Sequence, residues 1–324
     1  MKTPGSKNKV RLARFVGGLL VLLAVTILVA ALLGSEKLAF FELNEQQKTI
    51  LFEIRLPRIL LGASVGASLA LAGASLQSLL RNPLAEPYLL GVSNGAALGT
   101  MLAFVFFSQI EFARPALAFA GASLATFVVY QMAKSRSGMN VERLVLSGVI
   151  VTTFLSSVIV LLTSLIDATK LRSFTFWLLG DLSQATANGF YLNFSAVIIG
   201  SFVLLRKGRA LNLLMIGERD AMDFGVEVEK TRLAVFAASS LLVGTAVAAS
   251  GSVGYVGLIV PHLVRLAAGS DNRFVIPLSA IAGAIFVVLA DTIARTAIAP
   301  RELPVGAITA LIGAPLFIYL LRRN

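Results

Sequence analysis

"ILLGASVGASLALAGASLQSLL", residues 59–80, runs for 22 residues without a charged side chain. An α-helix needs about 20 apolar residues to cross the hydrocarbon core of a bilayer. Glycine, alanine and serine recur along this run, and such small residues let transmembrane helices approach each other closely. The stretch therefore predicts a transmembrane helix, over residues 56–80, that packs tightly inside a helical bundle.

Long apolar runs recur on both sides of this stretch. Hydrophobic residues make up 57% of the 324 residues and the mean hydropathy is +0.85, whereas soluble domains are about 45–50% apolar. No polar stretch reaches the roughly 50 residues that a small soluble domain needs. We expect an all-α polytopic membrane protein with about ten transmembrane helices, forming a single transmembrane domain over residues 1–324. The expected spans are residues 16–34, 56–80, 88–108, 115–133, 144–165, 188–205, 233–250, 256–268, 274–297 and 304–321.

The chain begins with a basic leader followed by an apolar run from Phe15 to Gly34. A signal peptide has the same order of charge, but its apolar core is only about 7–15 residues long. The longer run predicts a retained first span rather than a cleaved signal.

The net charge of +11 raises the question of nucleic-acid binding, and its distribution argues against it. With a cytoplasmic N-terminus and an even number of spans, both termini lie inside, together with 19 of the 28 Lys and Arg residues. Acidic residues divide almost evenly between the two sides. The positive-inside rule explains this asymmetry, so we expect a multi-pass protein of the bacterial cytoplasmic membrane with no nucleic-acid partner.

Residues suited to catalysis or metal binding are scarce. The chain has no cysteine and one histidine, which excludes thiolate chemistry and a multi-histidine metal site. His262 stands beside a proline in an apolar helix and is expected to be a packed, hydrogen-bonded residue. Asp291 and Arg295 are four residues apart on one helical face and can pair; we favour a structural pair over a proton relay, which would need several carboxylates. No catalytic residue, metal site or bound cofactor is predicted.

Two interruptions break the apolar pattern, "RNPLAEPYLLGVSNG" at residues 81–95 and "YVGLIVPHLVRLAAG" at residues 255–269. The second is too short to cross a bilayer alone. Short or proline-broken segments are tolerated at membrane depth only where protein or a water-filled path surrounds them. One interruption falls in each half of the chain, as in transporters built from inverted repeats.

The segment "LLMIGERDAMDFGVEVEKTR", residues 213–232, differs from its apolar surroundings because eight of its 20 residues are charged. Its acidic character argues against an amphipathic helix on anionic lipid, since such helices favour Lys and Arg. We expect two short helices with a glycine break, which place an apolar face on the membrane domain or on a partner. Together with the preceding "RKGRALN" they form a cytoplasmic segment over about residues 206–232.

Four blocks of sequence carry a resemblance to a known family. They are "RLPRILLGASVGASLALAGASLQSLLRNPLAEPYLLGVSNGAALG" (55–99), "LMIGERDAMDFGV" (214–226), "GYVGLIVPHLVRL" (254–266) and "ADTIARTAIAPRELPVGAITALIGAPLFIYLL" (290–321). Distributed over nearly the whole chain, they resemble the FecCD-type permeases of bacterial ATP-binding-cassette (ABC) importers for iron-siderophores, haem and cobalamin. The resemblance implies ten spans, a second permease subunit in a homodimer or heterodimer, two cytoplasmic ATPases that bind ATP and Mg²⁺, and a periplasmic or lipid-anchored substrate-binding protein.

The same resemblance assigns roles to individual residues. Gly217, Glu218, Ala221 and Gly225 match the motif by which such permeases dock their ATPase, which makes 206–232 a coupling segment.

Arg55, Arg58 and Arg295 match arginines that receive glutamates from the binding protein, and arginine on the outer side runs against the positive-inside bias. The local alternative pairs Arg55 with Glu53 and Arg295 with Asp291.

Ser147 and Gly148, near the inner end of the span 144–165, are proposed for an inner gate between subunits. Their alternative role is ordinary helix packing.

Two other functions fit parts of the pattern. An ion-coupled secondary transporter would use the broken helices, but it needs buried carboxylates and the spans offer only Asp291. An intramembrane enzyme acting on lipid phosphates would need clustered carboxylates for Mg²⁺, and no such cluster lies in or beside a span. Membrane lipid surrounds the protein on every one of these hypotheses.

Overall fold

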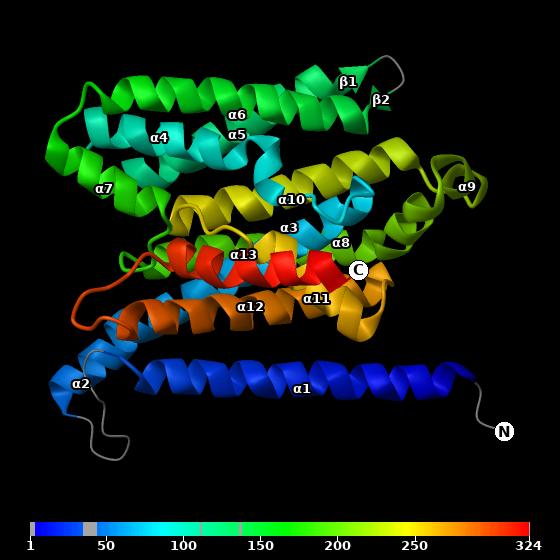
Figure 1. The fold of residues 1–324 in the computed structure, drawn as a ribbon, viewed down its shortest axis with the longest axis horizontal. Helices are drawn as coiled ribbons and strands as arrows, with labels where there is room; N and C mark the ends of the chain where they lie inside the picture. The colour runs from blue at the N-terminus through cyan, green and yellow to red at the C-terminus, as the bar shows by residue number, and fades with distance from the viewer. Residues whose placement is uncertain (1–3, 35–43, 111, 136–137, 324) are drawn as a thin grey trace.

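The computed structural model describes residues 4–34, 44–110, 112–135 and 138–323, and this part of the chain is almost entirely helical (Figure 1). The first half contains α1 (Pro4–Leu32), α2 (Glu45–Thr49), the π-helix η1 (Ile50–Arg55), α3 (Leu56–Leu79), the 3₁₀-helix η2 (Pro87–Leu90), α4 (Val92–Phe106) and α5 (Ala113–Ala133). A two-residue hairpin, β1 (Lys134–Ser135) and β2 (Gly138–Met139), leads into α6 (Val141–Thr163) and α7 (Ala168–Leu178). The second half contains α8 (Ala187–Ile216), α9 (Glu218–Asp223), α10 (Val228–Ser250), α11 (Val256–Ala268), α12 (Asn272–Thr296) and α13 (Val305–Arg323).

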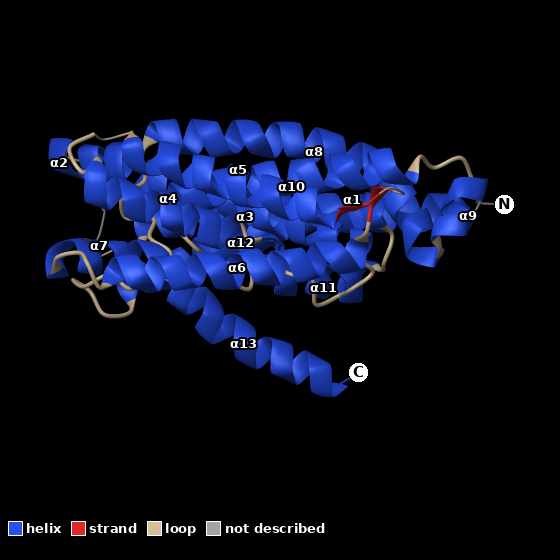
Figure 2. Cartoon of the chain, turned by 90° about the horizontal axis from the view of Figure 1, so that it is seen from above, coloured by secondary structure: helices blue, strands red, loops and turns tan. Residues whose placement is uncertain are grey.

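The fold class expected from the sequence is confirmed. Among the described residues, seven helices are long and apolar enough to cross a membrane, and three shorter apolar helices, α4, α11 and α13, accompany them. The long helices lie nearly parallel, while α13 diverges from the bundle (Figure 2). One end of the molecule carries α9 and the start of α1, and the other carries α2 and α7 (Figure 1).

Helix α3, which contains the apolar run 59–80, lies at the centre of the bundle. Twenty of its 24 residues are buried, and it packs against α8, α10, α11 and α12. A Cβ atom on Gly66 would lie 2.1 Å from the carbonyl oxygen of Gly283 in α12, and one on Gly73 would lie 2.0 Å from that of Gly257 in α11. Glycine is therefore required where the backbones touch, as the small-residue pattern predicts.

A buried polar cluster joins α3 to α8 and α10. Asn193 of α8 donates through Nδ2 to Ser68 Oγ at 3.1 Å and to Thr245 Oγ1 at 3.0 Å, and it accepts from Ser64 Oγ at 2.6 Å. All four side chains are buried. Because a buried amide without partners is costly, these bonds fix the relative position of the three helices.

The two interruptions seen in the sequence are hydrogen-bonded to each other. The Tyr88 hydroxyl in η2 donates to the Val253 carbonyl and accepts from the Val253 N–H, both at 3.0 Å. Glu86 accepts from the Tyr255 N–H at 3.2 Å. Side chains of the first half thus satisfy backbone groups beside the second interruption, as membrane depth demands.

Among the differences from the expected helix boundaries, those at α7 and α8 change the interpretation most. Helix α7 occupies part of an interval where no helix was expected, and Asp167 caps its start by accepting from the Lys170 N–H. Helix α8 continues through the basic residues beyond 205 to Ile216. The expected first short helix of the coupling segment is therefore wrong: it is the last part of a 30-residue helix, because "RKGRALNLLMI" keeps good helix formers after its charges.

Candidate functional site

The coupling segment forms a sharp corner at one end of the molecule. Gly217 ends α8 in extended backbone, α9 follows at once, and Gly225 returns the chain to α10 with a φ of +79°. Nothing lies within 4 Å of the position a Cβ on Gly225 would take. Glycine is therefore required here by the backbone conformation, since a positive φ is costly for other residues.

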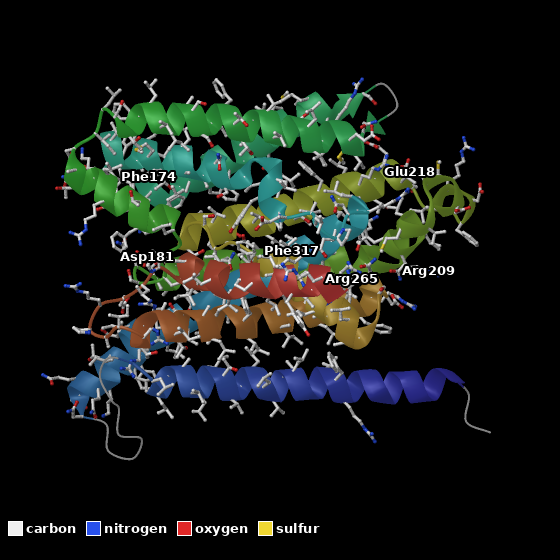
Figure 3. All side chains as sticks on the ribbon, in the orientation of Figure 1. Phe174, Asp181, Arg209, Glu218, Arg265 and Phe317 are labelled. Carbon is white, nitrogen blue, oxygen red and sulfur yellow. The ribbon has the colours of Figure 1, made fainter. Side chains whose placement is uncertain are left out.

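Glu218 holds this corner to the membrane domain. Its carboxylate pairs with Arg232 of α10 and lies 3.9 Å from Nη2 of Arg81, just beyond the end of α3. Figure 3 shows Glu218 near the α9 end of the bundle. Arg232 also donates to the Met139 carbonyl at 3.1 Å, and Glu229 accepts from the Met139 N–H at 2.9 Å. The corner is thereby tied to β2 and to the beginning of α6.

The side chains of the segment divide into buried and exposed sets. Ala221 is fully buried, so its side chain shapes the corner and is not available to a partner in this structure. Ile216, Met222 and Phe224 are 73%, 54% and 74% exposed; we call these three the apolar coupling surface. The sequence shows which residues of this segment are apolar. It does not predict which of them are exposed, because α9, at six residues, is too short to show a helical periodicity.

The three arginines expected on the outer side lie together. Arg55, Arg58 and Arg295 line a pocket of about 200 Å³ with Gly34 and Glu302, at the end of the molecule opposite α9. Each arginine is only 5–6% exposed. A Cβ on Gly34 would lie 2.3 Å from Nη2 of Arg55, so glycine makes room for this guanidinium. We call this the arginine pocket.

Ion pairs within the chain organise the pocket. Arg58 bonds Asp291 with Nη2 at 2.9 Å and Glu302 with Nη1 at 2.7 Å. Arg295 Nε lies 3.1 Å from Asp291 Oδ2, which confirms the expected pair between these two residues. Arg55 donates through Nη1 to the carbonyl oxygens of Ala31 and Leu32.

Sequence reasoning missed the partners of Arg58. They lie 233 and 244 residues away along the chain, and only the packing of α3 on α12 brings them together.

Ser147 and Gly148 lie inside α6. Ser147 is buried, and a Cβ on Gly148 would lie 1.9 Å from the Leu89 carbonyl oxygen of η2. In this structure Ser147 is packed inside the bundle, and Gly148 serves the close packing of α6 on η2. Their neighbours Leu146 and Val149 are 60% and 49% exposed, so they, rather than the predicted pair, face outward.

The expected structural role of His262 is supported in part. Its ring packs edge-on against Phe317 of α13, labelled in Figure 3, with 6.5 Å between centroids. Its Nε2 is buried without a hydrogen-bond partner among the described residues. Within the same described part of the chain, no group of three or more His, Asp and Glu side chains is arranged to hold a metal ion.

A polytopic helical bundle with a broken, irregular segment in each half is the kind of fold found in membrane transporters. The chain belongs to the FecCD transport family, whose model matches residues 15–323. It is a transmembrane permease of the ABC-importer type.

Relatives and a solved structure support this assignment. The chain is 44% identical to the cobalamin import system permease protein BtuC of Halobacterium salinarum, over 87% of this chain and 76% of that protein. It is 38% identical to the hemin transport system permease protein HmuU of Yersinia pestis, over 95% of both chains. A solved ABC transporter of the metal-chelate type, in an inward-facing conformation, matches with a TM-score of 0.89 and 34% identity, over 96% of this chain and all of that one.

Proposed function

We propose that this chain forms, with a second permease subunit, the path by which an iron chelate or cobalamin crosses the bacterial cytoplasmic membrane. The names of its relatives, which cover cobalamin and hemin permeases, support this range of cargo. In this proposal the whole chain is one transmembrane domain with both termini in the cytoplasm. ATP and Mg²⁺ bind to two ATPase subunits, and a periplasmic or lipid-anchored binding protein delivers the cargo.

The apolar coupling surface is the observation that carries the proposal. Ile216, Met222 and Phe224 expose large apolar side chains beside the charged residues of α9, at an end of the bundle that a soluble protein can reach. Exposed apolar patches mark contacts with protein or membrane, and the acidic residues of α9 beside this one favour a protein over anionic lipid. An ATPase subunit docked here would move α9 together with the helices attached to it.

Gly217, Glu218, Ala221 and Gly225 then act by shaping the segment. The two glycines set its corners, Ala221 fills its interior, and Glu218 connects it through Arg232 to Met139 and α6. Closure of the ATPase pair would thus be transmitted to α6, which carries Ser147 and Gly148, the residues proposed for the inner gate.

The arginine pocket is proposed to receive a carboxylate of the binding protein. The planar fork of the guanidinium suits that ligand. Because Arg58 already pairs with Asp291 and Glu302, the incoming carboxylate must compete for Arg58 with Glu302, the more exposed of the two.

The ion-coupled alternative loses support from the same pocket. The carboxylate that a proton or sodium ion would need is Asp291, and two guanidiniums already hold it. The expected driving force is therefore ATP hydrolysis on the partner subunits.

The proposal is tested by co-purification and by ATP hydrolysis in proteoliposomes. Met222→Asp with Phe224→Asp should abolish capture of the ATPase subunit and hydrolysis stimulated by the binding protein, because two charges replace the apolar contact. Ile298→Asp is the control for capture of the ATPase subunit, since Ile298 is a comparably exposed apolar residue away from α9. Full stimulated hydrolysis by the double variant would contradict the proposal.

The docking role of the pocket has its own test. Glu302→Gln removes the competing carboxylate and makes the pocket more positive by one charge, so the binding protein should associate several-fold more tightly, with a steeper salt dependence. Glu45→Gln, on α2 at the same end, should leave affinity unchanged. Weaker association of the Glu302→Gln variant would contradict docking at the arginine pocket.

A further inference from the structure

A second basic pocket, separate from the arginine pocket, lies at the α9 end between α8 and the start of α10. Its volume is about 450 Å³. Its cations are Arg206, Lys207 and Arg209 of α8 and Lys230 of α10, against one acid, Glu227. Leu213 and Phe224 add apolar surface to its wall. Figure 3 shows Arg209 beyond the apolar part of α8, toward the α9 end.

The cations stand at a defined depth along α8. From Ala187 to Leu205 the helix has 19 residues without a charge, a length of about 28 Å at 1.5 Å per residue. The hydrocarbon core of a bilayer is about 30 Å thick. Arg206, Lys207 and Arg209 therefore follow directly where the acyl chains end and the lipid headgroups begin.

The pocket offers hydrogen-bond donors as well as charge. The first residues of α10 border it, and Glu227 at the N-cap of this helix makes no side-chain cap bond within the described structure. The first N–H groups of a helix are natural partners for an anion. Arg206 lies over the ring of Phe202 at 4.1 Å, which restrains its guanidinium beside the pocket.

We infer that this pocket binds the phosphate headgroup of an anionic phospholipid from the cytoplasmic leaflet. Basic pockets between transmembrane helices on the cytoplasmic side bind such headgroups, and here four cations surround one acid at headgroup depth. The inference takes the α9 end as the cytoplasmic side, and it goes beyond the transport function proposed above.

A bound lipid would act on the coupling segment. One wall of the pocket belongs to α8, and the other is the linker that connects α9 to α10. A headgroup between them would hold the linker against α8 and so stabilise the position of α9.

The other end of the molecule supplies a matched control. Arg172 of α7 lies over Phe176 as Arg206 lies over Phe202, and Lys170 pairs with Asp167 as Lys230 pairs with Glu227. The variant Arg206→Gln with Lys230→Gln and the variant Arg172→Gln with Lys170→Gln lower the net charge equally. The two variants differ only in which end of the molecule loses positive charge.

The test uses the full chain reconstituted in phosphatidylcholine vesicles with and without phosphatidylglycerol. Phosphatidylglycerol that stays with the protein after detergent extraction is measured by native mass spectrometry. The pocket variant lacks two cations, each of which contributes about 1 kcal/mol near the surface. It should therefore retain at least about tenfold less phosphatidylglycerol. The α7 variant should retain as much as the wild type. Where the double variant fails to insert, Arg209→Gln alone should give a smaller loss in the same direction.

Two results would overturn the inference. Equal retention by the pocket variant and the wild type would show that lipid does not bind here. Displacement of the lipid by inorganic phosphate alone, in the wild type, would show a site for free phosphate instead. Neither readout depends on the ATPase subunits, so failure here is distinguishable from failure of the transport proposal.

Discussion

Asp291 is the residue on which the arginine pocket depends. It is 2% exposed and is shared between Arg58 and Arg295. Isolated charges at this depth are costly, and each member of the cluster is tolerated because the others are present. Removing the shared carboxylate should therefore lower the free energy of unfolding more than removing an exposed ion pair does.

Asp291→Ala should lower the free energy of unfolding by about 3–5 kcal/mol, because it leaves two buried guanidiniums without their common partner. Thermal unfolding in detergent measures the loss. Glu45→Ala, which breaks the exposed pair with Lys48 at the same end, is the control and should have little effect. Equal effects of the two substitutions would show that the buried cluster contributes nothing specific.

Asp271, at the N-cap of α12, should make the stability of the fold depend on pH. Hydrogen bonding from Arg273, helped by Asn212, lowers the pKa of the Asp271 carboxyl from 3.8 to about 2. A lowered folded-state pKa stabilises the fold above the unfolded value, and this stability is lost as the pH falls from about 4 toward 2.

The wild type should therefore lose unfolding temperature between about pH 4 and pH 2 more steeply than Asp271→Asn, which carries no titrating group at this position. The difference should be small and should shrink at high salt, since the Arg273 pair is near the surface. Calorimetry in detergent at low and high salt measures it. Parallel profiles for the two proteins at low salt would refute the assignment.

At the scale of elements, the contact between the two interruptions holds the halves of the chain together. Tyr88 in η2 satisfies both backbone groups of Val253, which precedes α11. A lost partner in a buried site costs the full desolvation of the group left behind. The single hydroxyl of Tyr88 therefore stabilises both interruptions, the one at η2 and the one that leads into α11.

Tyr88→Phe should reduce the free energy of unfolding by about 1–3 kcal/mol, because the Val253 N–H and carbonyl lose their partner. Tyr319→Phe, at a tyrosine that is more than half exposed, serves as the control and should be neutral. Denaturant titration in detergent compares the two variants. A neutral Tyr88→Phe would mean that another group or water replaces the hydroxyl.

The sequence predicts the elements better than their ends and contacts. Charge-free runs such as residues 59–80 predict the spans because lipid requires them. The apolar pattern ends α8 too early, because arginine and lysine stop a membrane span without stopping a helix. It does not predict α7, because the mix of Lys170, Arg172 and aromatic residues lacks the length of a span.

Contacts between distant residues are harder to predict than spans. The Asp291–Arg295 pair follows from helical spacing, whereas the bonds from Arg58 to Asp291 and Glu302 follow only from how α3 crosses α12. For the same reason the sequence shows that Ile216, Met222 and Phe224 are apolar but not that they are exposed.

At the scale of the whole molecule, α3 joins the two candidate sites. Arg58 near its beginning lines the arginine pocket, and Arg81 just beyond its end lies beside Glu218 of the coupling segment. The helix between them is buried on nearly all sides and packed backbone to backbone against α11 and α12. Such a rigid element favours movement of helices as bodies rather than bending within them.

Such movement makes α6 the place to look for the inner gate. Glu229 and Arg232 connect the coupling segment to Met139, two residues before α6 begins. Leu146 and Val149 are exposed on the turns where Ser147 is buried and Gly148 packs against η2. If α6 closes the path between two permease subunits, these exposed residues are the ones that approach the partner.

The chain has no cysteine, so single cysteines report this approach directly. Leu146→Cys and Val149→Cys should each cross-link to the second subunit in one nucleotide state and much less in another, because ATP-driven closure moves α6. Ser147→Cys should cross-link poorly in every state, since its side chain is buried. Val160→Cys is the control for depth: it is exposed on the same face of α6, but about 17–21 Å farther along the helix at 1.5 Å per residue. Gel electrophoresis of the oxidised, reconstituted complex measures the yield. State-dependent cross-linking at 146 and 149 with constant yield at 160 places the moving constriction at the end of α6 nearest the coupling segment, whereas no cross-link at 146 and 149 in any state removes α6 from the gate.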